Sequence, residues 1–214
     1  MIVKSYEINK INLNKSNIIL LYGKNEGLQN EIIEKNFIYN FKGEISKYDE
    51  VEFIDNFETI YSELLNKSLF NDKKLIIILR VSERILKNIE QLQEKDTKDF
   101  ILVLKTSILE KKSKLRTFFE KSKKLITIPF YEDDTRTLTS IIYNYLNKYN
   151  IKLSRESINL LIARVGGNRE NLKNELTKIL QYSYTNNEIN LETVKKLTNL
   201  AENYGVNELA DNYL

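Results

Sequence analysis

Four short apolar runs, separated from one another by segments with helical spacing, constrain the fold most. They are residues 18–22, 75–79, 100–104 and 125–130, and a further short strand is expected over residues 44–49. A continuous apolar run of this length is typical of a strand buried on both faces. Strands that alternate with helices predict a mostly parallel sheet covered on both sides. We therefore expect an α/β domain.

Helices are expected between these strands, because apolar residues recur there three and four positions apart. The patterns are Leu28, Ile32 and Ile33, then residues 57–65, then residues 85–92, and finally a basic segment marked by Leu115, Phe118 and Phe119.

The sequence changes character after Phe130, where residues 131–134 are polar and mostly acidic. Later apolar residues all follow helical spacing, in segments around residues 138–146, 158–165, 172–180 and 191–200. Ser154 and Asn168 are expected helix N-caps, and Gly166 with Gly167 should end the helix between them. We place the domain boundary after residue 132 and expect a small helical bundle over residues 133–200.

Composition excludes several classes of chemistry. The 214 residues include no Cys and no His, so disulfides, thiol nucleophiles and Ser/His/Asp catalysis are excluded. A metal site would need carboxylates, which suits Mg²⁺ better than Zn²⁺. The net charge of +3 gives no strong argument for nucleic acid. No apolar run is long enough to cross a membrane, so we expect a cytoplasmic protein without membrane association.

A phosphate-binding loop would be expected after the first strand, but its pattern fails. Counted from Gly23, the required Gly, Lys and Ser or Thr fall on Leu28, Gln29 and Asn30. The strand 75–79 is followed by Arg80 rather than by an acidic pair that could hold Mg²⁺. We expect no ATP hydrolysis, no cofactor and no catalytic residue.

Asp133 and Asp134 could bind a metal ion or cap a helix. Adjacent carboxylates after a strand more often complement the dipole of the next helix, so the sequence favours capping and no metal site.

Ser68, Leu69, Phe70 and Asn71 form a turn that contains two large apolar residues. Leu69 and Phe70 belong to neither the preceding helical pattern nor the following strand. The residues alone favour side chains that help to cover the sheet, because apolar side chains outside regular patterns are common. The alternative is an exposed pair that fills a pocket of another protein.

Five segments in order resemble one family across nearly the whole chain. They are residues 20–26, 68–75, 109–116, 128–134 and 166–176. Together with the degenerate phosphate loop, these five segments resemble the delta subunit of bacterial DNA polymerase III. That protein is the clamp-loader subunit that opens the sliding clamp. The resemblance implies a RecA-like AAA+ domain over residues 1–132 that does not hydrolyse ATP. A helical lid domain over residues 133–200 follows.

The family has a third, collar domain, which is apparently absent; residues 201–214 would be the start of a truncated collar domain or a linker. Leu69 and Phe70, presented by Ser68 and Asn71, match the apolar pair that the family inserts into the clamp. The implied partners are the sliding clamp (beta subunit), the gamma/tau and delta prime loader subunits, and primer-template DNA. The chain would be a subunit without catalysis of its own in a DNA-directed DNA polymerase, a nucleotidyltransferase.

Two alternatives stay open. One is an active AAA+ ATPase, in which Arg169 would sense the γ-phosphate; the degenerate loop favours a structural ion pair for Arg169 instead. The other is a DNA-binding accessory protein that uses Lys111, Lys112, Lys114 and Arg116, although charge runs usually face solvent.

Overall fold

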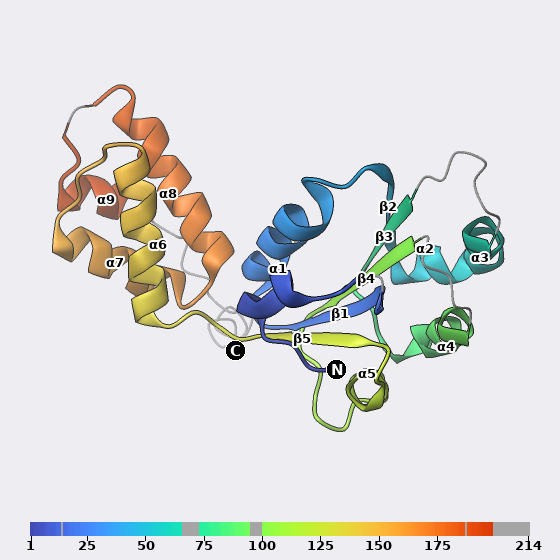
Figure 1. Ribbon diagram of the computed structural model, residues 1–214. Coiled ribbons are helices and arrows are strands. Elements are labelled where there is room, and N and C mark those ends of the chain that lie inside the picture. The colour runs from blue at the N-terminus through green and yellow to red at the C-terminus, as the bar shows by residue number, and fades with distance from the viewer. Residues whose placement is uncertain (14, 66–72, 95–99, 187, 199–214) are drawn as a thin grey trace, which may run out of the picture. The chain divides into compact units, whose positions relative to one another are not determined.

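The computed structural model describes residues 1–13, 15–65, 73–94, 100–186 and 188–198 (Figure 1). The chain divides into two compact units, Met1–Tyr131 and Glu132–Leu214. In the described residues, the first unit is built around a sheet and the second from helices alone. No helix in these residues has the length and apolar character needed to cross a membrane.

The described part of the first unit contains five parallel strands in the order β2–β3–β4–β1–β5. Every run predicted to be a strand is one, which confirms the predicted parallel α/β sheet. The strands are β1 (Ile18–Gly23), β2 (Gly43–Asp49), β3 (Lys73–Leu79), β4 (Phe100–Thr106) and β5 (Ile126–Phe130).

Both faces of the sheet are buried under helices (Figure 1). In β1, Ile18 and Leu20 belong to one core and Ile19 and Leu21 to the other, and none is more than 3% exposed. This double burial is why a parallel strand appears as a continuous apolar run. The first core includes side chains of α2 (Glu50–Asp55), α3 (Phe57–Leu65), η3 (Glu83–Ile85), α4 (Leu86–Glu94) and α5 (Lys114–Lys121), and the second those of η1 (Ser5–Lys10), α1 (Glu26–Ile32) and η2 (Ile33–Ile38).

The edge strand β5 explains the position of Pro129. The N–H of Thr127 donates to the carbonyl oxygen of Met1, and its own carbonyl accepts from the N–H of Val3, both at 2.9 Å. Pro129 lies two residues further along β5 and has no N–H to pair. An edge strand tolerates proline, so its place in the strand agrees with the predicted strand end.

The described part of the second unit contains α6 (Thr135–Lys148), α7 (Arg155–Val165), α8 (Arg169–Ser183) and α9 (Leu191–Leu197), which share one apolar core. The predicted N-caps are confirmed, because Ser154 accepts from the N–H of Ser157 at 3.2 Å and Asn168 from the N–H of Asn171 at 3.0 Å. Gly166 ends α7 in the left-handed conformation, as predicted.

Replacing Gly23 by Ala is expected to destabilise the first unit strongly. Gly23 has a φ of 136°, and a Cβ there would overlap the carbonyl oxygen of Phe130 in the paired strand β5. We expect the free energy of unfolding, measured by urea denaturation, to fall by about 3 kcal/mol. Gly166→Ala, with no atom within 4 Å of its Cβ, should cost only about 1 kcal/mol. Equal losses would contradict the close approach of β1 and β5.

Candidate functional site

The four residues that the resemblance assigns to clamp binding, Ser68, Leu69, Phe70 and Asn71, lie outside the described residues. The described chain stops at the end of α3 and resumes at the first residue of β3. Just inside β3, Lys74 forms ion pairs with Glu44 of β2 and Glu63 of α3, both at 3.6 Å. These pairs join the three elements where the chain enters β3.

The carboxyl ends of β1 and β4 form the place in this sheet that is best suited to a ligand. The two strands are neighbours, but α1 packs in one core and α5, which follows β4, packs in the other. Chain segments that diverge to opposite faces leave a crevice beyond the strand ends, where open α/β sheets bind ligands. Gly23 and Thr106 are the last residues of these strands, so the degenerate phosphate loop lies here.

Gln29 occupies the position at which a phosphate loop requires its lysine. Its side chain is fully buried. The Nε2 atom donates to the carbonyl oxygens of Gly23, at 3.0 Å, and of Thr106, at 3.3 Å. The amide thereby joins the ends of β1 and β4 to α1, and it is directed at the protein backbone rather than at a phosphate group.

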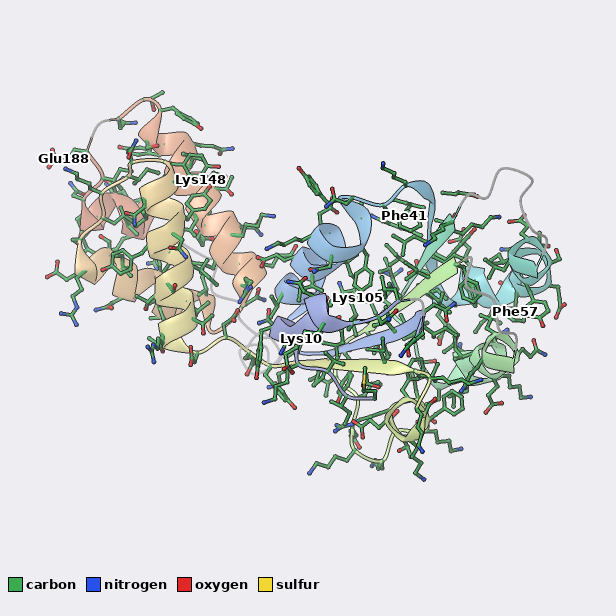
Figure 2. All side chains as sticks on the ribbon, in the orientation of Figure 1. Lys10, Phe41, Phe57, Lys105, Lys148 and Glu188 are labelled. Carbon is green, nitrogen blue, oxygen red and sulfur yellow. The ribbon has the colours of Figure 1, made fainter. Side chains whose placement is uncertain are left out.

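Asn30 occupies the position of the hydroxyl residue that would hold Mg²⁺. Its Oδ1 accepts a hydrogen bond from Lys105 Nζ at 2.7 Å, and the same ammonium lies 3.7 Å from Glu26. Figure 2 labels Lys105 on the ribbon. Lys105 comes from β4, and both of its partners come from α1. The ammonium group of Lys105 therefore joins β4 to α1.

At the end of β3, the position of an ATPase carboxylate is taken by Arg80. Arg80 has a left-handed φ of 56° and pairs with Asp49 of β2. The buried carboxylate of Glu50 accepts from the N–H of Ser82 at 2.6 Å and from its hydroxyl at 2.8 Å. The acidic groups here hold the turns after β2 and β3 together. In the described residues, no three or more His, Cys, Asp or Glu side chains form a group that could hold a metal ion.

The basic segment 110–124 includes α5 and carries seven Lys or Arg and two Glu residues, a net +5 in a chain of net charge +3. Arg116, which the sequence analysis grouped with lysines that could meet DNA, is engaged inside the unit. Its Nε donates to Glu120 at 2.8 Å, its Nη1 donates to the carbonyl of Leu109 at 3.3 Å, and its guanidinium lies 5.1 Å from the ring centre of Tyr22. The lysines of the segment are exposed, and Lys112 forms an ion pair with Glu110 at 3.0 Å.

In the second unit, Arg169 makes the structural ion pair that the sequence favoured. Its Nε and Nη2 donate to the two carboxylate oxygens of Asp133 at 2.7 and 2.6 Å, and both side chains are largely buried. The neighbouring Asp134 accepts from the N–H of Thr137 at 2.7 Å and caps α6, which confirms the capping prediction. The hydrogen bond to Thr137 holds the pKa of Asp134 below its ordinary value.

The structural role of Gln29 was not predicted, although the sequence contains a signal for it. Gln29 lies three and four positions before Ile32 and Ile33, so it shares their buried helix face. A polar residue on an apolar face needs hydrogen-bond partners, and backbone carbonyls at strand ends can supply them. The same residue, Gln29, therefore replaces the lysine that a phosphate-binding loop requires and supplies the buried amide.

We expect Gln29→Leu to lower the free energy of unfolding by about 2–4 kcal/mol, because the buried carbonyl oxygen of Thr106 and the half-buried one of Gly23 lose this donor. Chemical denaturation measures this loss. Gln91 of α4 is exposed, so Gln91→Leu should change stability by no more than about 0.5 kcal/mol. Similar values for the two variants would show that Gln29 does not brace the strand ends.

Tyr22 is expected to titrate later than an exposed tyrosine. Burial raises the pKa of Tyr22 to about 12 from 10.0, although Arg116 opposes the shift. The unfolded chain releases this proton first, so the stability associated with Tyr22 is present below pH 10 and is lost between pH 10 and about 12. In an absorbance titration of phenolate, Tyr22→Phe should remove a component near pH 12. The control Tyr39→Phe, at a side chain 78% exposed, should leave the component near pH 12 in place; its persistence in Tyr22→Phe would refute the burial effect.

No protein-family model matches the chain. Among curated proteins, it is 25% identical over 181 residues to a protein of Rickettsia prowazekii named probable DNA polymerase III subunit delta. The match covers 84% of this chain and 55% of the relative. The chain thus spans about half the length of the curated relative that it matches.

Three solved structures share the fold. The Bacillus subtilis DNA clamp loader delta protein is 17% identical with a TM-score of 0.50, and the match covers 90% of this chain and 62% of that protein. Domain III of the Thermotoga maritima replication initiation protein DnaA is 17% identical, with a TM-score of 0.51 and coverages of 90% and 87%. A mutant of Thermotoga maritima RuvB is 14% identical, with a TM-score of 0.59 and coverages of 90% and 64%.

These structural likenesses confirm the predicted RecA-like AAA+ fold class. The chain is a homologue of a bacterial protein named DNA polymerase III subunit delta, and the resemblance that its sequence indicates is confirmed.

Proposed function

We propose that this chain is a clamp-loader delta subunit, which binds a sliding clamp and opens it for loading onto primed DNA in chromosomal replication. The observation that carries the proposal is the buried amide of Gln29, which fills the phosphate-loop position of a RecA-like unit. Because the Gln29 amide supplies no cation for a phosphate group, we assign this unit a role in binding rather than in ATP hydrolysis. The relative named subunit delta supports the same assignment.

In this proposal the chain has no catalytic residue and needs no cofactor. It serves a DNA polymerase III holoenzyme in which other subunits perform the chemistry. The first unit is the clamp-binding AAA+-like domain, and the helical unit corresponds to a lid domain. The alternative of an active ATPase would need a lysine and a hydroxyl at the positions that Gln29 and Asn30 occupy.

The proposed clamp contact is Leu69 and Phe70, with Ser68 and Asn71 shaping the turn that presents them. Burying each apolar side chain in a pocket contributes about 1.5–3 kcal/mol. Two such side chains can anchor a micromolar contact after the cost of association is subtracted.

Opening the clamp requires a preference for its open form. A subunit with equal affinity for the closed and opened clamp would shift nothing, however tightly it bound. The energy of opening therefore comes from binding. The further partners in the proposal are the gamma/tau and delta prime subunits and primer-template DNA.

Contact with DNA is the part of the proposal that the charge distribution supports. Residues 110–124 carry a net charge of +5, and exposed lysines there could neutralise phosphates. Lys111, Lys112 and Lys114 are the candidates, whereas Arg116 is held by Glu120 and Leu109. A DNA-binding accessory protein would use the same lysines but would not need Leu69 and Phe70.

We expect the double variant Leu69→Ala with Phe70→Ala to weaken clamp binding about 100-fold or more, because roughly 3–6 kcal/mol of apolar burial is lost. Surface plasmon resonance with the cognate clamp measures the dissociation constant. Circular dichroism verifies that the variant is folded.

The matched control is Tyr39→Ala with Val51→Ala, which removes two exposed apolar side chains, 78% and 60% exposed, from the same unit. It should leave clamp affinity unchanged. A folded Leu69/Phe70 variant with wild-type affinity would refute the clamp contact. Calorimetric detection of ATP binding to the wild-type chain would instead favour the ATPase alternative.

A further inference from the structure

The loop between β4 and α5 is held at both ends by side chains of the first unit. This basic loop, residues 109–114, can be followed in Figure 1 and carries three exposed lysines, Lys111, Lys112 and Lys114. At its start, Nη1 of Arg116 donates to the carbonyl oxygen of Leu109 at 3.3 Å. At its end, the carboxylate of Glu83 in η3 accepts from the backbone N–H of Lys114 at 2.7 Å. The backbone of the basic loop is therefore positioned by two groups that lie outside it.

Arg116 is itself fixed against the sheet. Its Nε donates to Glu120, one turn further along α5, at 2.8 Å, and its guanidinium lies 5.1 Å from the ring centre of Tyr22. Tyr22 belongs to β1, is buried, and donates its hydroxyl to the same carboxylate at 3.3 Å. Because a peptide group is planar, the bond from this fixed guanidinium to Leu109 orients the peptide that leads into the basic loop.

We propose that Arg116 and Glu83 are positioning residues, which hold the basic loop ready for the phosphate groups of duplex DNA that its lysines contact. The inference rests on the proposed contact with primer-template DNA. A loop that is already ordered loses less conformational freedom when it binds, and its affinity is higher for that reason. The charge of Arg116 is paired with Glu120, so its contribution to binding is geometric.

The lysines of the basic loop contribute through charge. Lys112 forms an ion pair with Glu110 at 3.0 Å, and the two side chains are 87% and 69% exposed. Such surface pairs add little stability, so a DNA phosphate can take the place of the Glu110 carboxylate. Lys111 and Lys114 are exposed beside this pair.

Salt dependence separates the two roles. The logarithm of the DNA association constant falls with the logarithm of the salt concentration, with a slope of about −0.9 for each phosphate that a lysine neutralises. Lys111→Gln should therefore weaken binding and reduce the size of the slope by about 0.9. Arg116→Gln combined with Glu120→Gln removes the guanidinium without changing the net charge. This double variant should weaken binding about 3- to 10-fold at an unchanged slope.

Fluorescence anisotropy of a labelled primer–template duplex, with the full chain at about 20 to about 150 mM salt, measures both quantities. The matched control is Lys10→Gln with Glu7→Gln, which removes another ion pair of the first unit, 3.1 Å long, without changing the net charge. It should leave the dissociation constant and the slope unchanged.

Unchanged affinity in a folded Arg116/Glu120 variant would overturn the positioning role, and a slope reduced by about 0.9 would show instead that Arg116 binds a phosphate itself. If circular dichroism shows that this variant is unfolded, Glu83→Ala decides. It removes a negative charge, which by charge alone tightens DNA binding, so weaker binding would support the positioning role and tighter or equal binding would overturn it. A wild-type chain without salt-dependent DNA binding would refute the DNA contact itself, and this inference with it.

Discussion

The first unit depends on hydrogen bonds to the backbone carbonyl groups at which β1 and β4 end. A carbonyl oxygen buried without a donor costs about 1–3 kcal/mol. In a phosphate-binding loop, backbone N–H groups and a lysine bind the phosphate of the ligand at this position. Here the amide of Gln29 bonds to Gly23 and Thr106, and Lys105 bonds to Asn30. The chain thus provides internally the contacts that hold helix and strands together.

The turn that follows β1 also holds a backbone group at the end of the first unit. The next turn residue, Asn25, caps α1 and also holds the carbonyl of Tyr131. The turn after β1 therefore also positions Tyr131, the last residue of the first unit. Within the second unit, the ion pair between Asp133 and Arg169 joins the residues just before α6 to the start of α8.

Local physics explains what the sequence could predict. Strands buried on both faces leave apolar runs, and N-caps such as Ser154 and Asn168 depend on neighbours three residues away, so both are visible in the sequence. The six-residue elements η1 and α2 were missed because each has too few periodic apolar residues. The bonds of Gln29 to Thr106, and of Arg169 to Asp133, join residues far apart in sequence. Sequence spacing indicates that a buried polar side chain needs hydrogen-bond partners, but it does not identify partners that are distant in the sequence. Leu69 and Phe70 remain a prediction, since they lie outside the described residues.

The proposed function requires the chain to bind the opened sliding clamp more tightly than the closed one. The most direct measurement compares its affinity for the closed cognate clamp with its affinity for a clamp variant whose subunit interface is weakened so that it is open or monomeric. The account predicts tighter binding to the opened form, because only differential affinity can shift the equilibrium toward opening. Equal dissociation constants for the two forms would contradict it.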